Sequence, residues 1–424
     1  MTRQVLAWAM YDWANSAFAT TVIAGFFPLF FKQYWSHNAD PSQSTFELGM
    51  ANAAASVVVA VLAPVLGAIA DRTASVKRYL LVFVSLGVLM TFMLSLVGQG
   101  QWVWAAAIYA LAGIGFAGGN VFYDALLMGV TPRAEFARVS SLGFSLGYLG
   151  GGALFTLNVL MTLHPDWFGL VDATQAVKVS FVSVALWWVV FSIPLFVWVD
   201  GAASNANVDT TRSAFTQIGE GLRALRATFT QLRQLRTVWL FLIAYWFYID
   251  GVHTIIRMAV DYGLSLGFDA NSLIVALLLT QFVGFPAALG FGWLGHRVGA
   301  KIGIFLGLAV YCVVVVWAYF MRDPWEFYFL AGAIGLAQGG VQALSRSLYA
   351  SLIPKEQAGQ FFGFFNMLGK FAAIFGPLLV GVVALTTGST RVSILSVTVL
   401  FVIGAVLLHK VKATGLETQG SQSN

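Results

Sequence analysis

The sequence predicts an all-α integral membrane protein, and three observations support this fold class. About twelve apolar stretches follow one another along the chain, and most have the roughly 20 residues that a helix needs to cross a bilayer. Hydrophobic residues make up 59% of the 424 residues and charged residues only 10%, against about a quarter in an ordinary globular chain. The mean hydropathy is +0.80. We therefore expect a bundle of helices, because lipid forces each backbone polar group to find its partner within its own helix.

The expected spans, in chain order, are 5–31, 47–70, 79–98, 102–130, 139–163, 176–199, 237–260, 271–294, 302–320, 325–351, 360–385 and 392–409. An even number of spans places both termini on one side of the membrane. Short loops on that side hold sixteen Lys and Arg residues, and the loops on the other side hold four, namely Lys32, Lys178, Arg322 and Arg391. Cytoplasmic loops are rich in Lys and Arg, so we expect both termini in the cytoplasm. We expect the protein to lie in a bacterial inner membrane. The net charge of +5 then reflects orientation and predicts no nucleic-acid partner.

The chain divides into two six-helix halves, residues 1–199 and 237–424, joined by a polar segment at 200–236. In that segment apolar residues recur at three- and four-residue spacing, with arginines on other faces of the helix. This pattern predicts an amphipathic helix on the cytoplasmic membrane surface. Its simplest role is a tether between the halves, and a regulatory site is the alternative.

The two halves repeat one pattern. Gly67–Arg72 (GAIADR) follows the second span, and Gly292–Arg297 (GWLGHR) follows the eighth. The fourth and tenth spans both end at a proline, and counting back from these prolines pairs Asp124 with Arg346. A duplicated six-helix unit indicates a two-lobed transporter whose substrate site lies between the lobes near the middle of the membrane.

Three further stretches carry a family resemblance: Tyr11–Phe18 (YDWANSAF), Gly339–Ser347 (GGVQALSRS) and Phe361–Lys370 (FFGFFNMLGK). With the loop at Gly67–Arg72, they resemble the major facilitator superfamily, and within it the family of the autophagy-related vacuolar amino-acid effluxer and its bacterial relatives. The resemblance spans essentially all twelve helices. One departure is His296, which stands where the first half has Asp71 and predicts a weaker loop contact.

This resemblance implies a 12-helix major facilitator fold with two pseudo-symmetric six-helix lobes, and a monomer. It also implies secondary active transport of a small organic solute by alternating access. We expect the solute to be an amino acid or a similar zwitterion that is exported, with proton coupling left open. A flippase or scramblase of lipid-like substrates and a transport-inactive sensor are the alternatives.

Charged side chains inside lipid are costly and usually face a cavity or a partner, so each one is a candidate for function. In the seventh span Asp250, His253, Arg257 and Asp261 fall on one helical face. Asp250 and His253 lie deep in the span and can both titrate, so they indicate either a substrate or proton-coupling role or a structural hydrogen-bonded pair. Arg257 and Asp261 are four residues apart and can pair along the helix, either as part of an outer gate or as a structural pair.

A cytoplasmic gate is the second hypothesis. Asp124 carries a charge opposite to that of Arg346 and of Lys370 at repeat-related depth. We expect Asp124 to pair with one of them across the lobes and close the cytoplasmic end, where Asp71 and Arg72 also contribute. The alternative is an ion pair within one lobe.

Polar residues of the spans complete the candidate substrate site. Gln338 and Gln342 form one stripe with Arg346, and Asn366 lies four residues before Lys370. Asp12 and Asn15 share a face of the first span, where Asp12 either binds a substrate amine or stabilises a neighbouring helix. A zwitterion needs one anionic and one cationic partner, which Asp12 or Asp250 supplies together with Arg346 or Lys370.

The sequence contains no nucleotide-binding motif, no His-Glu-x-x-His cluster and no evident Ser/His/Asp set, so we expect neither an enzyme nor a cofactor or metal. Its single cysteine, Cys312, lies in an apolar run. The expected partners are the small-molecule substrate, protons where transport is coupled to them, and membrane lipid.

Overall fold

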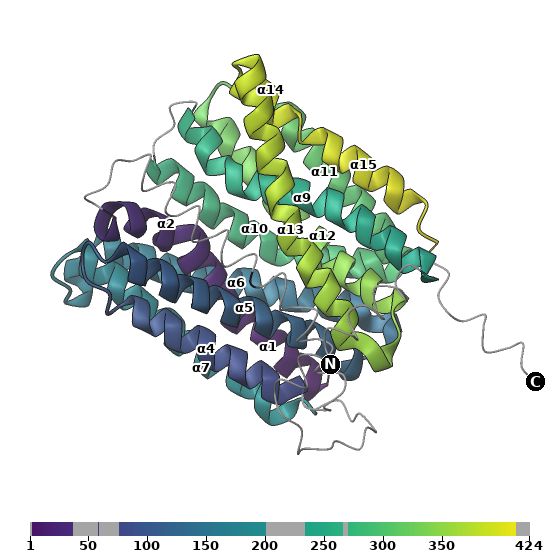
Figure 1. The fold of residues 1–424 in the computed structure, drawn as a ribbon, viewed down its shortest axis with the longest axis horizontal. Helices are drawn as coiled ribbons and strands as arrows, with labels where there is room; N and C mark the ends of the chain where they lie inside the picture. Colours follow the sequence, from purple (N-terminus) through teal and green to yellow (C-terminus); the bar gives the residue numbers. More distant parts are fainter. Residues whose placement is uncertain (1, 37–57, 59–75, 201–233, 266–269, 413–424) are drawn as a thin grey trace, which may run out of the picture.

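The computed structural model describes residues 2–36, 58, 76–200, 234–265 and 270–412, and every regular element in this part of the chain is helical (Figure 1). The helices of the first half are α1 (Arg3–Ala17), η1 (Phe18–Phe26), α2 (Phe27–Phe30), η2 (Phe31–Trp35), α4 (Val76–Leu94), α5 (Trp102–Val130), η3 (Arg133–Glu135), α6 (Phe136–Leu163), η4 (Pro165–Phe168) and α7 (Ala173–Trp198). Those of the second half are α9 (Arg236–Ser265), α10 (Ala270–Val298), α11 (Ala300–Phe320), α12 (Pro324–Leu352), η5 (Lys355–Gln357), α13 (Ala358–Thr387), α14 (Thr390–Leu395) and α15 (Thr398–His409).

Ten helices of the described residues are long and apolar enough to cross a membrane. They correspond to ten of the twelve expected spans. Of the other two, the span at 47–70 lies outside the described residues apart from Val58, and α13 occupies the eleventh with a shorter apolar stretch at Phe375–Ala384. The amphipathic helix expected within 200–236 also lies outside the described residues, apart from the end of that segment.

Two expected spans differ from the structure in their continuity. The first extends from Arg3 through Trp35, and over Phe18–Phe26 its hydrogen bonds run to the fifth preceding residue, as from the N–H of Phe27 to the carbonyl of Val22. Such wide turns inside helices are uncommon and often occur at functional sites. The twelfth span divides into α14 and α15, and the hydroxyl of Ser396 at the division donates to the Ser393 carbonyl.

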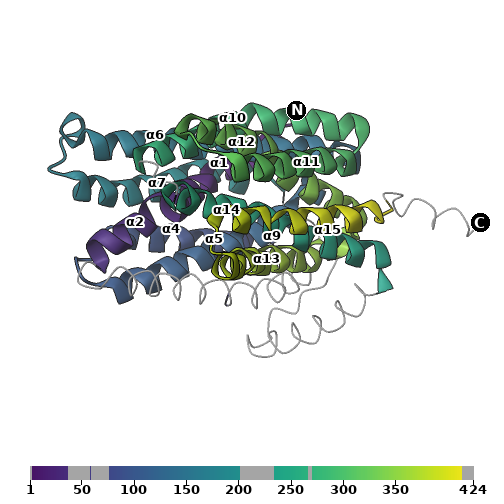
Figure 2. The ribbon, with the colours of Figure 1, turned by 90° about the horizontal axis from the view of Figure 1, so that it is seen from above.

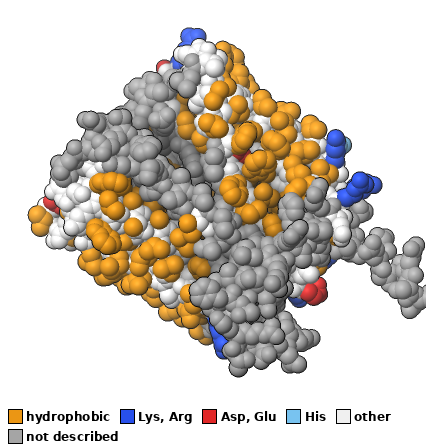
Figure 3. Space-filling model, in the orientation of Figure 1, with side chains coloured by type: hydrophobic (Ala, Val, Ile, Leu, Met, Phe, Trp, Pro, Cys, Tyr) orange, Lys and Arg blue, Asp and Glu red, His pale blue; other side chains and the backbone are white. Residues whose placement is uncertain are grey.

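The helices form two lobes. In Figure 1 the helices α1 to α7 lie on one side and α9 to α15 on the other, and the start of α1 and the end of α15 lie toward the same end of the bundle. Figure 2 shows the helices running side by side along one direction, with α6 of the first lobe next to α10 of the second. Hydrophobic side chains cover the sides of the helices, whereas most Lys and Arg side chains in view lie near the helix ends (Figure 3). This distribution is the one that a bilayer requires.

A matched pair of lysines shows the repeat in three dimensions. Lys77, at the start of α4, donates from Nζ to the carbonyls of Phe196 and Val199 at the end of α7, at 2.9 and 2.6 Å. Lys301, at the start of α11, donates in the same way to two carbonyls at the end of α15, at 2.8 and 2.7 Å. A helix leaves its last four carbonyls without intrahelical partners, and a cation there satisfies them. The third helix of each lobe therefore caps the sixth.

The lobes meet most closely along α6 and α10. A Cβ at Gly292 of α10 would lie 2.5 Å from Cβ of Ser141 on α6, so the two backbones approach to a distance that only glycine allows. Four residues further along α6, the Ser145 hydroxyl donates to the Phe285 carbonyl of α10 at 2.8 Å. This contact places the first turns of α6 at the lobe boundary, where they reach α12.

Candidate functional site

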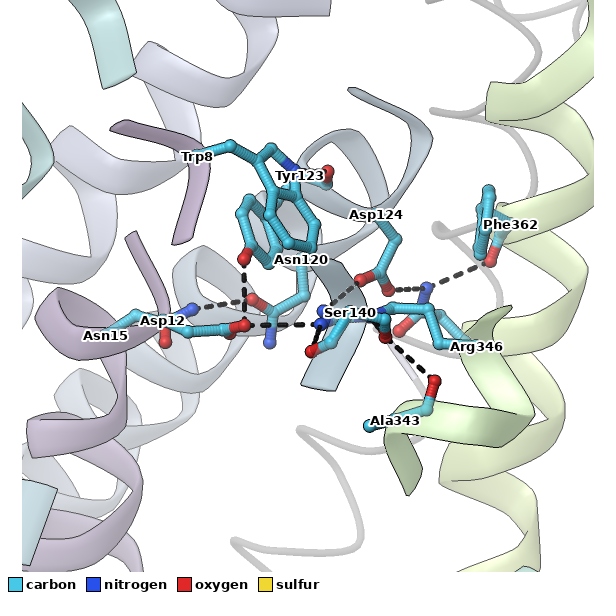
Figure 4. A network of polar contacts seen from close by, with 11 residues as sticks. Trp8, Asp12, Asn15, Asn120, Tyr123, Asp124, Ser140, Ala343, Arg346 and Phe362 are labelled. Carbon is cyan, nitrogen blue, oxygen red and sulfur yellow. Dashed lines mark hydrogen bonds and ion pairs between the residues drawn. The ribbon is translucent and has the colours of Figure 1, made fainter. Parts of the chain in front are cut away.

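Arg346 is the centre of a buried polar network between the lobes (Figure 4). Its side chain leaves α12 of the second lobe and is only 3% exposed. Nη1 donates to Oδ1 of Asp124 on α5 at 3.1 Å, and Nη2 donates to Oδ2 of Asp12 on α1 at 3.3 Å. Nε and Nη2 donate to the hydroxyl and the carbonyl of Ser140 on α6, at 2.8 and 2.9 Å. The Ser140 hydroxyl in turn donates to the Ala343 carbonyl at 2.8 Å. One guanidinium therefore joins three helices of the opposite lobe.

Asp124 binds a second helix of the opposite lobe. Its Oδ2 accepts a hydrogen bond from the amide nitrogen of Asn366 on α13 at 3.0 Å, and that amide also donates to the Phe362 carbonyl at 3.0 Å. The two oxygens of this carboxylate thus connect α5 to α12 and to α13. The sequence hypothesis paired Asp124 with Arg346 or Lys370 across the lobes, and the structure brings Asp124 and Arg346 together. The alternative of a pair within one lobe does not hold for them.

Asp12 is held from its own lobe as well as from the other. The Tyr123 hydroxyl donates to Oδ2 of Asp12 at 2.8 Å, and Nε1 of Trp8 donates to the Tyr123 carbonyl at 3.0 Å. Asn15, one turn further along α1, donates to Oδ1 of Asn120 at 2.8 Å. Asp12 therefore contacts a neighbouring helix and the guanidinium of Arg346, and its binding of a substrate amine stays a prediction.

Aromatic rings surround the guanidinium of Arg346. Its central carbon lies 4.8 Å from the centre of the Trp8 ring, 4.5 Å from that of Phe144 and 5.5 Å from that of Tyr123. These distances are those of cation–π contacts, which strengthen when water is excluded. The rings and the carboxylates together replace the water that a buried guanidinium loses.

The electrostatics of this cluster are unusual, because two carboxylates face one guanidinium. Asp12 and Asp124 are both buried, so their attraction to Arg346 acts in a medium that screens charge weakly. Separating the lobes here breaks bonds to Arg346 that cross the boundary and exposes three charged groups to a new environment. Breaking these contacts would therefore cost free energy unless other groups or water replaced them.

Two more bonds close the boundary at the same end of the bundle. Nη2 of Arg133, in η3, donates to the Ile353 carbonyl at 3.2 Å. Nδ1 of His296, at the end of α10, lies 3.2 Å from the Ala134 carbonyl. His296, which departs from the repeated loop pattern, thus contacts the opposite lobe. These contacts join the two lobes at the end of the bundle where α1 begins and α15 ends.

Asp250 and His253 lie on α9, apart from this cluster. Oδ1 of Asp250 accepts a hydrogen bond from the N–H of Gly376 on α13 at 3.0 Å. Gln338 and Gln342 are half-buried on α12, and the hydrogen bonds of the described residues do not join them to the Arg346 cluster.

Several expected site residues cannot be placed. Asp71 and Arg72 lie outside the described residues, as do the side chains of Arg257, Asp261 and Lys370. The outer gate expected from Arg257 and Asp261 and the part expected of Lys370 therefore stay predictions.

Sequence reasoning missed Ser140, Trp8 and Phe144 as partners of Arg346. Ser140 contributes both its hydroxyl and its carbonyl, and no charge or repeat marks it in the sequence. Trp8 lies four residues before Asp12, on the same face of α1, and this spacing was the available signal.

Comparison with known proteins identifies the family of this chain. Residues 48–415 match the family described as "Vacuole effluxer Atg22 like". The chain belongs to this family. It is 40% identical over 410 residues to the MFS-type transporter YxiO of Bacillus subtilis (strain 168), which covers 96% of this chain and 94% of YxiO.

The Atg22-like family also includes fungal proteins. Autophagy-related protein 22 of Yarrowia lipolytica (strain CLIB 122 / E 150) is 26% identical over 310 residues, which are 67% of this chain and 52% of the fungal protein. The crystal structure of the human organic anion transporter MFSD10 (TETRAN) superimposes with a TM-score of 0.73 over 96% of this chain and 99% of that chain, at 15% identity. The fold is therefore that of the major facilitator superfamily, and the chain is a multi-pass membrane transporter of this type.

Proposed function

We propose that this protein is a secondary active transporter that exports an amino acid or a similar zwitterion by alternating access. The observation that supports the proposal best is the buried contact of Arg346 with Asp12 and Asp124 of the opposite lobe. A charged, buried and hydrogen-bonded contact between lobes can stabilise the arrangement in which it is made, and a solute or proton that replaces it can stabilise the arrangement in which it is broken. Transport by rocking lobes needs such a two-state element.

The excess of Lys and Arg in the loops near both termini supports a cytoplasmic location for that end of the bundle, in a bacterial inner membrane. In this orientation the state described here is closed toward the cytoplasm. Asp124, Arg346 and Asp12 then form the cytoplasmic gate, and opening it admits the solute that is exported.

A zwitterion suits this cluster because it carries both groups that compete for it. The carboxylate of the solute can replace an aspartate on Arg346, and its ammonium can neutralise the aspartate that is released. Without such a replacement, opening leaves buried charges without partners, which costs several kcal/mol. A proton on Asp12 or Asp124 lowers that cost in the same way, and this supports proton coupling as part of the proposal.

Reconstitution tests the proposal. The full chain is placed in proteoliposomes, and uptake of radiolabelled amino acids of each chemical class is measured by exchange against internal unlabelled amino acid, with and without a pH gradient. We expect saturable exchange for at least one class and its loss in Arg346→Gln. Absence of exchange for every class in protein that remains monodisperse would end the amino-acid proposal.

A further inference from the structure

Exposed cations gather at one end of the seam between α6 and α10, the two helices that run side by side along the lobe boundary (Figure 2). The stretches that form this end are η3 with the first turn of α6, and the last turn of α10 with the first turn of α11. They hold four Lys and Arg residues. Two of these, Arg133 and Lys301, already donate to backbone carbonyls. The other two, Arg138 of the first lobe and Arg297 of the second, are exposed.

Contacts with α12 show on which edge of the seam these two arginines lie. Ser140 of α6 donates to a carbonyl of α12, and a Cβ at Gly295 of α10 would touch Leu344 of α12. Arg138 and Arg297 are each two residues away from these contacts, which is about 200° around a helix of 3.6 residues per turn. Both arginines therefore lie on the edge of the seam opposite α12, one from each lobe.

Both arginines retain donors for a further partner. Arg138 has a side chain that is 71% exposed, and its Nη1 lies 3.7 Å from Oε2 of Glu135, beyond hydrogen-bond distance. The guanidinium of Arg297 lies 4.3 Å from the centre of the Trp293 ring. This cation–π contact uses the face of the guanidinium and not its N–H groups.

The end of α10 lacks acidic residues that could neutralise these cations. Residues 292–301 contain no Asp or Glu. His296 stands where the first half has Asp71, and its Nδ1 lies 3.2 Å from the Ala134 carbonyl across the seam. A ring nitrogen therefore occupies the position at which the repeat has a carboxylate, and the seam ends in an electropositive patch.

An exposed apolar stripe of α10 leads to this patch. Phe282, Leu289 and Trp293 are exposed and precede Arg297 by 15, 8 and 4 residues, so all four lie on one helical face. In a membrane this face contacts lipid. An acyl chain along the stripe brings the phosphate of its own lipid level with Arg297 and across the seam from Arg138.

We propose that this end of the seam binds an anionic phospholipid, with its phosphate between Arg138 and Arg297 and a chain on the apolar stripe of α10. Phosphate oxygens match the forked N–H donors of arginine, and basic pockets between membrane helices bind anionic head groups. Because the two arginines belong to different lobes, the bound phosphate joins the lobes. The site does not depend on which solute the protein moves.

Native mass spectrometry of the delipidated full chain in detergent tests the site. The protein is titrated with phosphatidylglycerol or with phosphatidylcholine of the same acyl chains, and the dissociation constant of each bound lipid is measured. We expect one phosphatidylglycerol to bind at least about tenfold more tightly than phosphatidylcholine, whose choline cancels the phosphate charge. Arg138→Gln and Arg297→Gln should each weaken this binding about fivefold, the effect of one cation on an anionic lipid.

The matched control is Arg236→Gln, which removes an exposed arginine at the start of α9, at the same end of the bundle but outside the seam. It should leave the dissociation constant unchanged. Equal weakening by Arg236→Gln would overturn the site, because the lipid would then follow the overall positive charge of this end. Equal affinity for phosphatidylcholine would overturn it as well.

Competition separates a lipid site from a site for free phosphate. Inorganic phosphate and sn-glycerol 3-phosphate, each in large excess, carry the charge without the chains and should leave phosphatidylglycerol bound. Displacement of the lipid by either one would overturn the assignment to a phospholipid, because the apolar stripe would then contribute nothing.

Discussion

Replacing Asp124 by asparagine tests the contact between the lobes most sharply. The change keeps the shape of the side chain and removes its charge, so Arg346 retains only Asp12 as an ionised partner. A hydrogen bond to a charged group contributes about 1.5–3 kcal/mol. The lower end of this range applies, because Asp12 and Asp124 repel each other and the asparagine oxygen still accepts a hydrogen bond. We therefore expect the closed state to lose about 1.5 kcal/mol, which is roughly tenfold in the ratio of closed to open molecules.

Double electron–electron resonance between two spin labels measures the ratio of closed to open molecules. Cys312→Ser removes the single native cysteine. Arg138→Cys at the start of α6 and Glu356→Cys in η5 then place exposed labels on opposite lobes, at the end that Arg133 closes. Asp124→Asn should move a clearly larger share of the distance distribution to long distances.

The matched control is Asp166→Asn, which removes an exposed carboxylate in η4 and should leave the distribution as it is in the parent protein. If Asp124→Asn and Asp166→Asn gave the same distribution, the ion pair would contribute nothing to closure. The energetic reasoning from burial and distance would then be wrong.

Two further substitutions test how the lobes are built. Gly143→Ala should lower the melting temperature and the free energy of unfolding by about 1–3 kcal/mol, because its Cβ would collide with Oδ2 of Asp12. Gly129→Ala, which has open space around its Cβ, should be neutral and serves as the control. Equal melting temperatures of the two variants would contradict this reasoning. Lys77→Met should cost about 1–3 kcal/mol of stability by leaving two carbonyls at the end of α7 without their cation, and the exposed neighbour Arg78→Met serves as its control in the same thermal assay.

The fold could be predicted almost entirely from the sequence. Within the described residues, apolar length alone locates ten of the membrane helices, because the bilayer leaves few alternatives for a buried backbone. The division of the last span into α14 and α15 could not be predicted, because no glycine or proline marks it in the sequence. The capping roles of Lys77 and Lys301 could not be predicted either, because they depend on where the sixth helix of each lobe ends in space.

Half of the candidate site could be predicted. The repeat places Asp124 and Arg346 at equal depth with opposite charge, and this is enough to suggest that they meet. It does not indicate that Asp12 meets them too, because the matched positions that pair Asp124 with Arg346 include no residue of the first span. The contribution of Ser140 follows from the close approach of α6 and α10, which is a property of the packed lobes and not of any local pattern.

Alternating access requires the two ends of the bundle to move in opposite senses. Distances measured at both ends test this requirement directly. The label pair at positions 138 and 356 reports the end with both termini, and Trp167→Cys with Arg322→Cys, both exposed, reports the other end. We predict that amino-acid addition or Asp124→Asn lengthens the first distance and shortens the second in the same samples. Two distances that stay fixed, or that change together, would contradict rocking of the lobes about the Arg346 cluster.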